Sequence, residues 1–351
     1  MAAVAHLNPP NSPSLSERRR NHNFRLLSVV SASAKNKLRV NGINGFPSDD
    51  PCLSLRVAFQ GSHGAYSEFA AKTAIPNCAT LPCRSFSDAI AAVENGRADR
   101  AVLPVESTME GTALRNYDLL LRRDLRITQE ISLFVHYCLL AMPGVRTTEL
   151  RRVISHPMAL AHCGRAISQL GLRREPVEDT AGAVQMLRSH RLLDTAAIAS
   201  PRAGLLYGLD VLADGLQDAS WNVTRFLLLS KPVTAATTVS GKAKTSMVVA
   251  HRGGSMMVLL KVLSAFSSRN INLTKLEVNN PSIEGQGPVM VLDVKAMGSL
   301  RAFSHLIYVD FEGSTEDFRV QEALEEIAGF SVFVRILGCY AADSNVYDLH
   351  Y

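Results

Sequence analysis

The sequence of 351 residues lacks several features that would assign it to a class at once. None of its six cysteines forms a Cys-x-x-Cys pair, so the sequence indicates reduced thiols rather than a disulfide framework or a zinc site. Its apolar runs are shorter than the ~18 residues that a membrane-spanning helix needs. It contains neither a Gly-Lys-Ser/Thr phosphate loop nor a complete dinucleotide fingerprint. His156 and His162 lie six residues apart, which does not place them on one helical face, so no metal site is predicted.

Acidic residues are almost absent from the first 48 positions. Glu17 is the one acid there against seven basic residues, a net charge of +6, which leaves −1 of the overall +5 for the remainder. The basic balance is therefore no argument for a nucleic acid or a membrane as partner. Residues 1–48 are also rich in Ser, Asn, Ala and Arg, a composition typical of an organellar transit peptide. A disordered basic tail without a targeting role is the alternative.

Residues 55–231 alternate short β-rich runs with helical patterns. The pattern predicts strands at 55–60, 101–105, 152–155, 195–199 and 224–229, and helices at 67–72, 115–122, 159–170, 181–189 and 201–207. Such alternation is typical of an α/β domain with largely parallel sheets.

Residues 232–243 are small and polar, as in a linker, and a second domain is predicted over 244–343. Its expected strands are 245–250, 271–278, 305–312 and 331–338, its expected helices are 255–268 and 315–328, and 280–301 is expected to be an irregular insertion. Ser314 or Thr315 is the expected N-cap of the last helix. The order βαββαβ predicts a ferredoxin-like module.

Small polar residues follow several predicted strands of the first domain. Ser67, Ser107, Thr108, Ser155 and Thr180 all stand near the start of a helix or at the exit of a strand. Free backbone N–H groups at such places favour the binding of a carboxylate or phosphate. Any one of these residues could instead be a simple helix cap, and the reaction stays open at this level.

The segment 217–226, which contains Asn222-Val223-Thr224-Arg225-Phe226, strongly resembles the prephenate and arogenate dehydratase family. The Asn-x-Thr-Arg-Phe motif of that family carries its catalytic threonine. Residues 58–68, 103–111, 155–163, 178–183 and 196–200 resemble other family segments in the expected order, and 244–246 with 269–277 resemble its ACT regulatory domain. The resemblance implies a two-lobed catalytic domain like a periplasmic binding protein, joined to an ACT domain.

The resemblance also implies an activity, the decarboxylative dehydration of arogenate to phenylalanine or of prephenate to phenylpyruvate. No metal or organic cofactor is implied. Thr224 would pass a proton to the departing hydroxyl, and Arg225 would either clamp a substrate carboxylate or pair with the scaffold. The other catalytic candidates are Ser155, Glu178 and Thr180, and the substrate-binding candidates are Ser67, Ser107, Thr108, Gly111, His162, Asn222 and Phe226.

The ACT resemblance implies phenylalanine as an effector bound between subunits of a homodimer or homotetramer. The residues that match the family's effector segments are Gly253, Gly254, Ser255, Asn272, Leu273, Thr274 and Glu277. A module kept mainly for dimerisation is the alternative. Together with the presequence, the resemblance predicts an enzyme of the chloroplast stroma.

Four positions depart from the residues that the family usually has, namely Ser107, Glu110, Met158 and His162. A carboxylate at Glu110 would repel an anionic substrate unless it turns to solvent. His162 could still donate a hydrogen bond, whereas Met158 could not. The alternative function is therefore a weak or inactive paralogue that acts as an aromatic-metabolite sensor or assembly partner.

Overall fold

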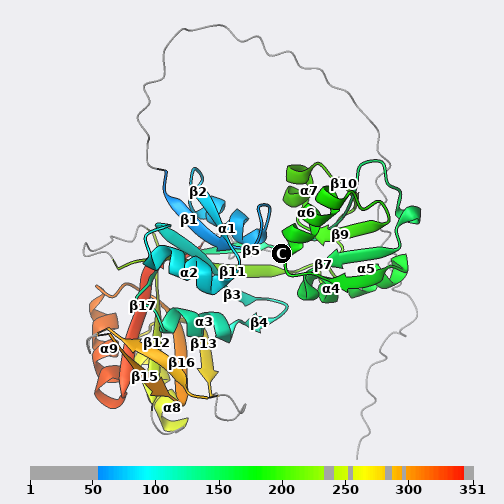
Figure 1. The fold of residues 1–351 in the computed structure, drawn as a ribbon. Helices are drawn as coiled ribbons and strands as arrows, with labels where there is room; N and C mark the ends of the chain where they lie inside the picture. Colours follow the sequence, from blue (N-terminus) through cyan, green and yellow to red (C-terminus); the bar gives the residue numbers. More distant parts are fainter. Residues whose placement is uncertain (1–53, 233–240, 252–255, 281–286, 295–297, 344–351) are drawn as a thin grey trace, which may run out of the picture.

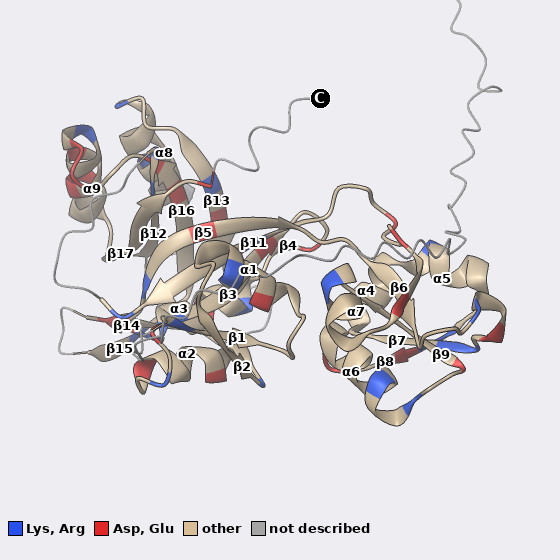
Figure 2. Ribbon diagram, turned by 90° about the horizontal axis from the view of Figure 1, so that it is seen from above, with Lys and Arg blue, Asp and Glu red and all other residues tan. Residues whose placement is uncertain are grey.

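The computed structural model describes residues 54–232, 241–251, 256–280, 287–294 and 298–343. The predicted transit peptide and most of the predicted linker lie outside these residues. The described chain forms two lobes that lie side by side and a C-terminal domain that packs against the first lobe (Figure 1). Basic and acidic residues are interspersed over all three parts (Figure 2).

The first lobe is built on one mixed sheet with the strand order β2-β1-β3-β11-β5 and a short β4 beside β3. Its first three strands run parallel, and β11 is antiparallel to both of its neighbours. The elements are β1 (Arg56–Gln60), α1 (Tyr66–Ala74), β2 (Ala79–Cys83), α2 (Phe86–Glu94), β3 (Arg100–Ser107), β4 (Gly111–Thr112), α3 (Leu114–Leu121), β5 (Arg126–Phe134) and β11 (Val223–Ser230).

The second lobe has a five-stranded sheet in the order β10-β6-β9-β7-β8. Its elements are β6 (Cys138–Ala141), β7 (Arg152–Ser155), α4 (Pro157–His162), α5 (Gly164–Leu170), β8 (Arg173–Pro176), α6 (Thr180–His190), β9 (Thr195–Ala199), α7 (Pro201–Tyr207) and β10 (Asp210–Ala213), with a 3₁₀ turn at Thr147–Glu149. The chain crosses between the lobes after β5 and again before β11. These crossings are hydrogen-bonded to each other, Val135 N–H to Asn222 C=O at 2.7 Å.

The prediction of an α/β fold is confirmed, but the expectation of largely parallel sheets is wrong. β5 and β11 in the first lobe and β6 and β10 in the second pair antiparallel. The predicted helix 159–170 is two helices, because the chain turns at Cys163. The carboxylate of Asp218 accepts the Arg165 N–H at 3.1 Å and so supplies a partner at the start of α5.

The C-terminal domain has the expected βαββαβ order with a hairpin inserted. Its elements are β12 (Ala243–His251), α8 (Met256–Ser267), β13 (Leu273–Asn279), the hairpin β14 (Val289–Asp293) and β15 (Ser299–Phe303), β16 (His305–Glu312), α9 (Phe318–Phe330) and β17 (Phe333–Ala341). The four main strands form an antiparallel sheet in the order β13-β16-β12-β17.

Two expectations for this domain are wrong. The predicted irregular insertion contains the hairpin, whose Val289, Val291 and Phe303 are buried in a core shared with the first lobe. The last helix begins at Phe318 and is capped by Asp317, which accepts the Arg319 N–H at 2.9 Å. The expected cap region forms a turn instead.

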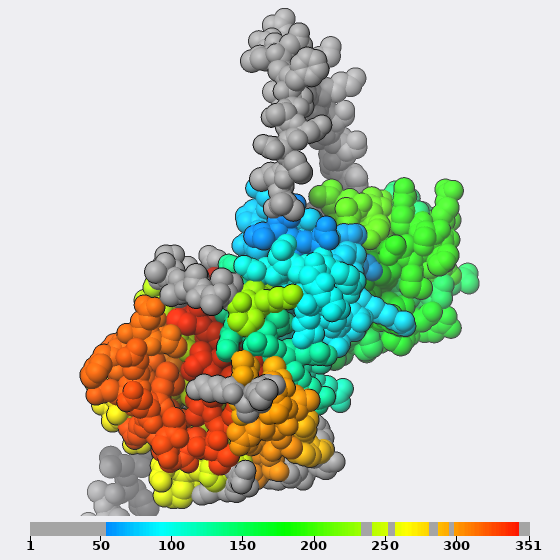
Figure 3. Space-filling model, turned by 60° about the vertical axis from the view of Figure 1, so that its left-hand side comes forward, coloured from blue at the N-terminus to red at the C-terminus, as the bar shows by residue number. Residues whose placement is uncertain are grey.

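The C-terminal sheet is covered on one face by α8 and α9, and its other face packs on the first lobe (Figure 3). Tyr308 and Tyr340 are buried together with Leu120 and Ile127 of the first lobe. At Gly338 a Cβ atom would collide with the carbonyl oxygen of Ile127, so only glycine allows this approach of β17 to β5. The first lobe and the C-terminal domain therefore share one core.

No described helix is long and apolar enough to cross a membrane. Within the same residues, no group of three or more His, Cys, Asp or Glu side chains is arranged to hold a metal ion.

Candidate active site

Thr224 lies near the start of β11, directly opposite Ser107 of β3 on one side and Leu133 of β5 on the other. Side chains alternate along a strand, so Thr224 and its neighbour Arg225 point to opposite faces of the sheet. Gly111 of β4, with a φ of +74°, lies opposite Ser107. The sheet thus gathers three predicted site residues into one row.

Thr108 fixes the start of β11 rather than presenting a free hydroxyl. Its Oγ1 accepts the Val223 N–H at 3.0 Å and donates to the Trp221 carbonyl at 3.1 Å. Its N–H also donates to the Val223 carbonyl at 3.0 Å. The turn between β3 and β4 is therefore attached to the strand that carries Thr224.

Asn222 is a predicted site residue with an unused hydrogen-bond donor. It is only 2% exposed, and its side-chain Nδ2 has no partner among the described residues. It stands two residues before Thr224, so on an extended chain both side chains point to the same face. A buried unsatisfied donor costs about 1–3 kcal/mol. Asn222 is thus suited to donate a hydrogen bond to a bound substrate.

Glu110 and His162, two of the four departures from the family pattern, contact each other across the lobes. The Glu110 carboxylate lies 2.5 Å from His162 Nε2, and the side chains are 45% and 9% exposed. His162 Nδ1 is buried and has no partner among the described residues. Glu110 is thus paired and half-exposed, so it is not a free carboxylate that repels substrate.

We expect a double-mutant cycle with Glu110→Gln and His162→Gln to show a coupling of about 1 kcal/mol in urea unfolding. The value is modest because Glu110 is half in solvent. The matched control is Arg146 with Glu149, an exposed pair within one turn, for which the coupling should be clearly smaller. Additive effects of the Glu110 and His162 changes would contradict the pairing.

The structure places the other predicted site residues outside the row formed by Thr224, Ser107 and Gly111. Ser155 is fully buried and donates to the Ile198 carbonyl at 2.6 Å, Phe226 is 2% exposed in the core beside Leu133, and Ser67 is 7% exposed on α1. Thr180 is the first residue of α6, and Glu178 is exposed just before it. Their assigned roles remain predictions.

Two carboxylates that were not predicted as site residues bind the loop between β1 and α1, one from each lobe. Asp179 caps α6 by accepting the Ala181 and Gly182 N–H groups, and it also accepts the Ser62 N–H of the first lobe at 2.9 Å. Glu68 on α1 is 2% exposed and accepts the Gly64 N–H at 2.7 Å. Asp179, directly before a predicted helix, carries a cap signal in the sequence, whereas Glu68 has no local signal.

Several contacts hold Glu68 in its ionised form. Burial by itself raises the pKa of the carboxyl, but the Gly64 N–H and the side chains of His63, Lys72 and Thr80 outweigh it and lower the pKa to about 2. The contact distances are 3.0 Å to His63, 3.1 Å to Lys72 and 2.9 Å to Thr80. Glu68 thereby fixes the loop between β1 and α1.

We expect Glu68→Gln to destabilise the protein by roughly 3 kcal/mol at pH 7. The pKa is depressed in the folded state, so the stabilisation is complete above the ordinary value of 4.5 and is lost as the pH falls toward 2. Urea unfolding of both proteins between pH 7 and pH 3 should show the difference shrinking. A constant difference would contradict this origin. The control Glu94→Gln removes a surface pair with Arg123 and should cost less than about 1 kcal/mol.

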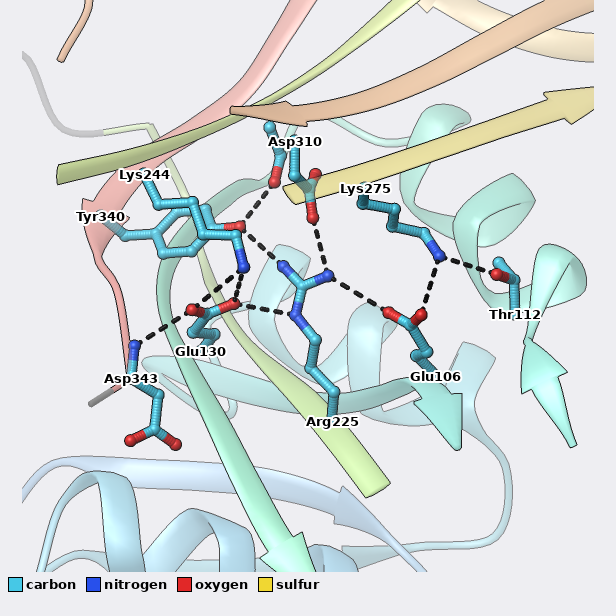
Figure 4. Close-up of polar contacts among 10 residues, drawn as sticks. Glu106, Thr112, Glu130, Arg225, Lys244, Lys275, Asp310, Tyr340 and Asp343 are labelled. Atoms are coloured by element: carbon cyan, nitrogen blue, oxygen red, sulfur yellow. Dashed lines mark hydrogen bonds and ion pairs between the residues drawn. The ribbon is translucent and has the colours of Figure 1, made fainter. Parts of the chain in front are cut away.

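Arg225 points away from Thr224 into an ion cluster between the first lobe and the C-terminal domain (Figure 4). Its guanidinium lies 2.7 Å from Asp310, 2.8 Å from Glu130 and 3.5 Å from Glu106. It also donates to the Tyr340 hydroxyl at 2.9 Å. Of the two alternatives for Arg225, the structure shows pairing with the scaffold.

Two lysines of the C-terminal domain complete this cluster. Lys244 lies 2.9 Å from Glu130, and Lys275 lies 3.3 Å from Glu106. The first lobe thus contributes two carboxylates and one cation, and the C-terminal domain contributes one carboxylate and two cations. The two faces are complementary in charge, and the cluster as a whole is neutral.

The cluster also fixes the charge of Arg225, whose side chain is 11% exposed. Burial alone would lower its pKa, but Asp310, with Tyr340, Tyr117 and Glu130, raises the pKa well above its ordinary value. A small cavity of about 190 Å³ borders this cluster and is also lined by Ser107 and Thr108.

The predicted effector residues are only partly described. Gly253, Gly254 and Ser255 lie outside the described residues. Leu273, Thr274 and Glu277 lie on β13, an edge strand of the C-terminal sheet, and the Asn272 carbonyl accepts the Glu312 N–H at 2.9 Å. Thr274 Oγ1 is buried and has no partner among the described residues.

The fold and the site define a class, a two-lobed α/β protein whose lobes meet beside a row of hydroxyl and amide side chains. The prephenate dehydratase family model matches residues 57–234. This chain belongs to the prephenate dehydratase family.

Curated relatives from plants are about half identical to this chain over the aligned residues. Arogenate dehydratase 1 of Petunia hybrida is 51% identical over 293 residues, which is 83% of this chain and 68% of the relative. Arogenate dehydratase/prephenate dehydratase 6, chloroplastic, of Arabidopsis thaliana is also 51% identical, over 83% of this chain and 70% of the relative.

Solved structures agree with the fold. A prephenate dehydratase from Arthrobacter aurescens in complex with L-Phe has a TM-score of 0.70 at 28% identity, over 82% of this chain and 90% of that chain. GqqA, described as a novel type of quorum quenching acylase, also has a TM-score of 0.70, at 33% identity over 82% of this chain and 98% of that chain.

Proposed function

We infer that this chain is an arogenate dehydratase, which converts L-arogenate to L-phenylalanine with loss of carbon dioxide and water. The observation that carries the inference is the 51% identity to a plant arogenate dehydratase over 83% of the chain. The geometry supports it, because Thr224 stands opposite Ser107 and two residues after the unpartnered amide of Asn222. Prephenate, which has a keto group in place of the amino group, is the second substrate to be tested.

The reaction needs proton transfer and the retention of carboxylates. The departing hydroxyl leaves as water, the ring carboxylate leaves as carbon dioxide, and the electron pair released by that carboxylate completes the aromatic ring. The Thr224 hydroxyl passes a proton to the departing hydroxyl. Ser107, Asn222 and His162 hold the substrate, Thr108 fixes the start of β11 beside them, and the chain requires no cofactor for these steps.

The test is turnover by the purified full-length chain, followed as phenylalanine formed from L-arogenate and phenylpyruvate formed from prephenate. We expect kcat/KM to be higher for arogenate. If neither substrate is converted faster than by the Thr224→Val variant, the assignment fails and the weak or inactive paralogue is the better description.

We further propose that the C-terminal domain is an ACT domain that binds phenylalanine and that residues 1–48 direct the protein to the plastid. Two relatives whose names include "chloroplastic" and the L-Phe complex of the bacterial relative support these two proposals.

We also propose a homo-oligomer. Leu276 and Val278 on the edge strand β13 are 41% and 49% exposed, which suits a contact between subunits. Light scattering of the purified chain tests the assembly.

A further inference from the structure

The side chain of Lys275 on β13 contacts both strands that flank the turn between β3 and β4. Its Nζ donates to Thr112 Oγ1 at 2.7 Å and lies 3.3 Å from Glu106 Oε1. The side chain is 7% exposed, and the ammonium lies 6.0 Å from the centre of the Tyr117 ring. Figure 4 shows Lys275 between these two partners. A buried lysine with two oxygen partners is a fixed support rather than a mobile surface group.

The turn that Lys275 supports carries candidate substrate-binding residues. β4 consists of Gly111 and Thr112, and among the described strands it pairs with β3 alone, so it has little support from its own sheet. Glu106 pairs with Thr112, and Ser107 pairs with Gly111. Lys275 therefore holds both members of the Glu106–Thr112 pair, which is next to the Ser107–Gly111 pair that closes this turn.

The same strand of the C-terminal domain carries the predicted effector residues Leu273, Thr274 and Glu277. The pairing of β13 with β16 shifts in register between Leu273 and Lys275. Such an irregularity bends the strand locally and can re-aim a side chain. Lys275 thus stands between the candidate effector segment and the candidate site.

We propose that Lys275 is a positioning residue of the dehydratase. Through Thr112 and Glu106 it fixes the turn at 107–112, and by this contact the C-terminal domain sets the geometry of Ser107, Thr108 and Gly111. The proposal rests on the proposed function for its effect on catalysis, but not for its effect on the turn.

The first test is hydrogen exchange of the full-length protein without substrate. We expect Lys275→Met to speed amide exchange in residues 107–113 by about tenfold or more, because the turn loses its charge-assisted bond. The matched control is Lys244→Met, which removes another buried lysine of the same domain that contacts Glu130 but not β4. It should leave exchange in this turn unchanged. Equal protection in wild type and Lys275→Met, or equal loss in both variants, overturns the proposal.

A second variant covers the case in which Lys275→Met does not fold. Thr112→Val removes the acceptor and leaves every charge in place, and it should speed exchange in the same turn. Lys275→Arg keeps the charge. Comparing Thr112→Val with Lys275→Arg therefore separates the contribution of the hydrogen bond to Thr112 from that of the ion pair with Glu106. If Thr112→Val exchanges like the wild type, Lys275 does not hold the turn through Thr112, and the proposal fails.

Kinetics then tests the consequence for the reaction. We expect Lys275→Met to raise the KM for arogenate about tenfold with a smaller change in kcat, and Lys244→Met to leave KM unchanged. An unchanged KM in Lys275→Met overturns the positioning role. If the wild type turns over neither arogenate nor prephenate, the proposed function fails, while hydrogen exchange still decides whether Lys275 fixes the turn.

Discussion

Thr224→Val is expected to lower kcat by about 10²–10⁴-fold with little change in KM, because valine keeps the shape of threonine and removes only its hydroxyl. In the structure this residue is flanked by Ser107 and Leu133 on the neighbouring strands. Asn222, two residues before it, is 2% exposed, and the side chain of the following Arg225 is 11% exposed. The surrounding strand should therefore stay in place. Steady-state measurement of phenylalanine formed from arogenate gives both parameters.

The matched control is Thr128→Val on β5. Its hydroxyl donates to the Leu228 carbonyl of β11 at 3.1 Å, four residues beyond Thr224 on the same strand. This variant should lose only about 0.5–1.5 kcal/mol of stability and keep its kcat. If Thr128→Val slows the reaction as much as Thr224→Val does, the loss reflects a disturbed β11 rather than a missing proton donor.

Local chemistry explains which parts of the fold could be predicted from the sequence. β7, β9, α7 and β16 match their expected bounds. In the structure α7 begins at Pro201 and is capped by Ser200, whose Oγ accepts the Ala203 N–H at 3.1 Å. β5 was missed because its polar and apolar residues do not show one period. It is buried by β11 on one side and by the C-terminal domain on the other, and neither partner is close in sequence.

The same distinction between local and long-range features applies to the candidate site. The row around Thr224 follows from a contiguous motif, so the sequence could indicate it. The partners of Arg225 lie on β3, β5 and β16, and the pairing of Glu110 with His162 joins residues 52 positions apart. A single sequence carries no signal for such pairs. Taken alone, Glu110 and His162 are departures from the family pattern, and Arg225 has two possible roles.

Arg225→Met is expected to destabilise the protein by about 3–5 kcal/mol, since it leaves a buried carboxylate without a cation. Asp310 is 2% exposed, and among the described residues Arg225 is the one cation that contacts it. Glu130 and Glu106 would keep Lys244 and Lys275. The loss should therefore arise mainly at Asp310, and urea unfolding measures it.

The double variant Arg225→Met/Asp310→Leu tests this origin. Removing both charges of a buried pair is often nearly neutral, so the double variant should recover at least about half of the lost stability. A double variant as unstable as the single one would show that the cost is lost packing rather than an unpaired carboxylate. Arg225→Lys should fall between wild type and Arg225→Met, because an ammonium can replace the charge but cannot reach Asp310, Glu130 and the Tyr340 hydroxyl at once. If Arg225→Met unfolds at the wild-type urea concentration, the cluster does not hold the C-terminal domain to the first lobe.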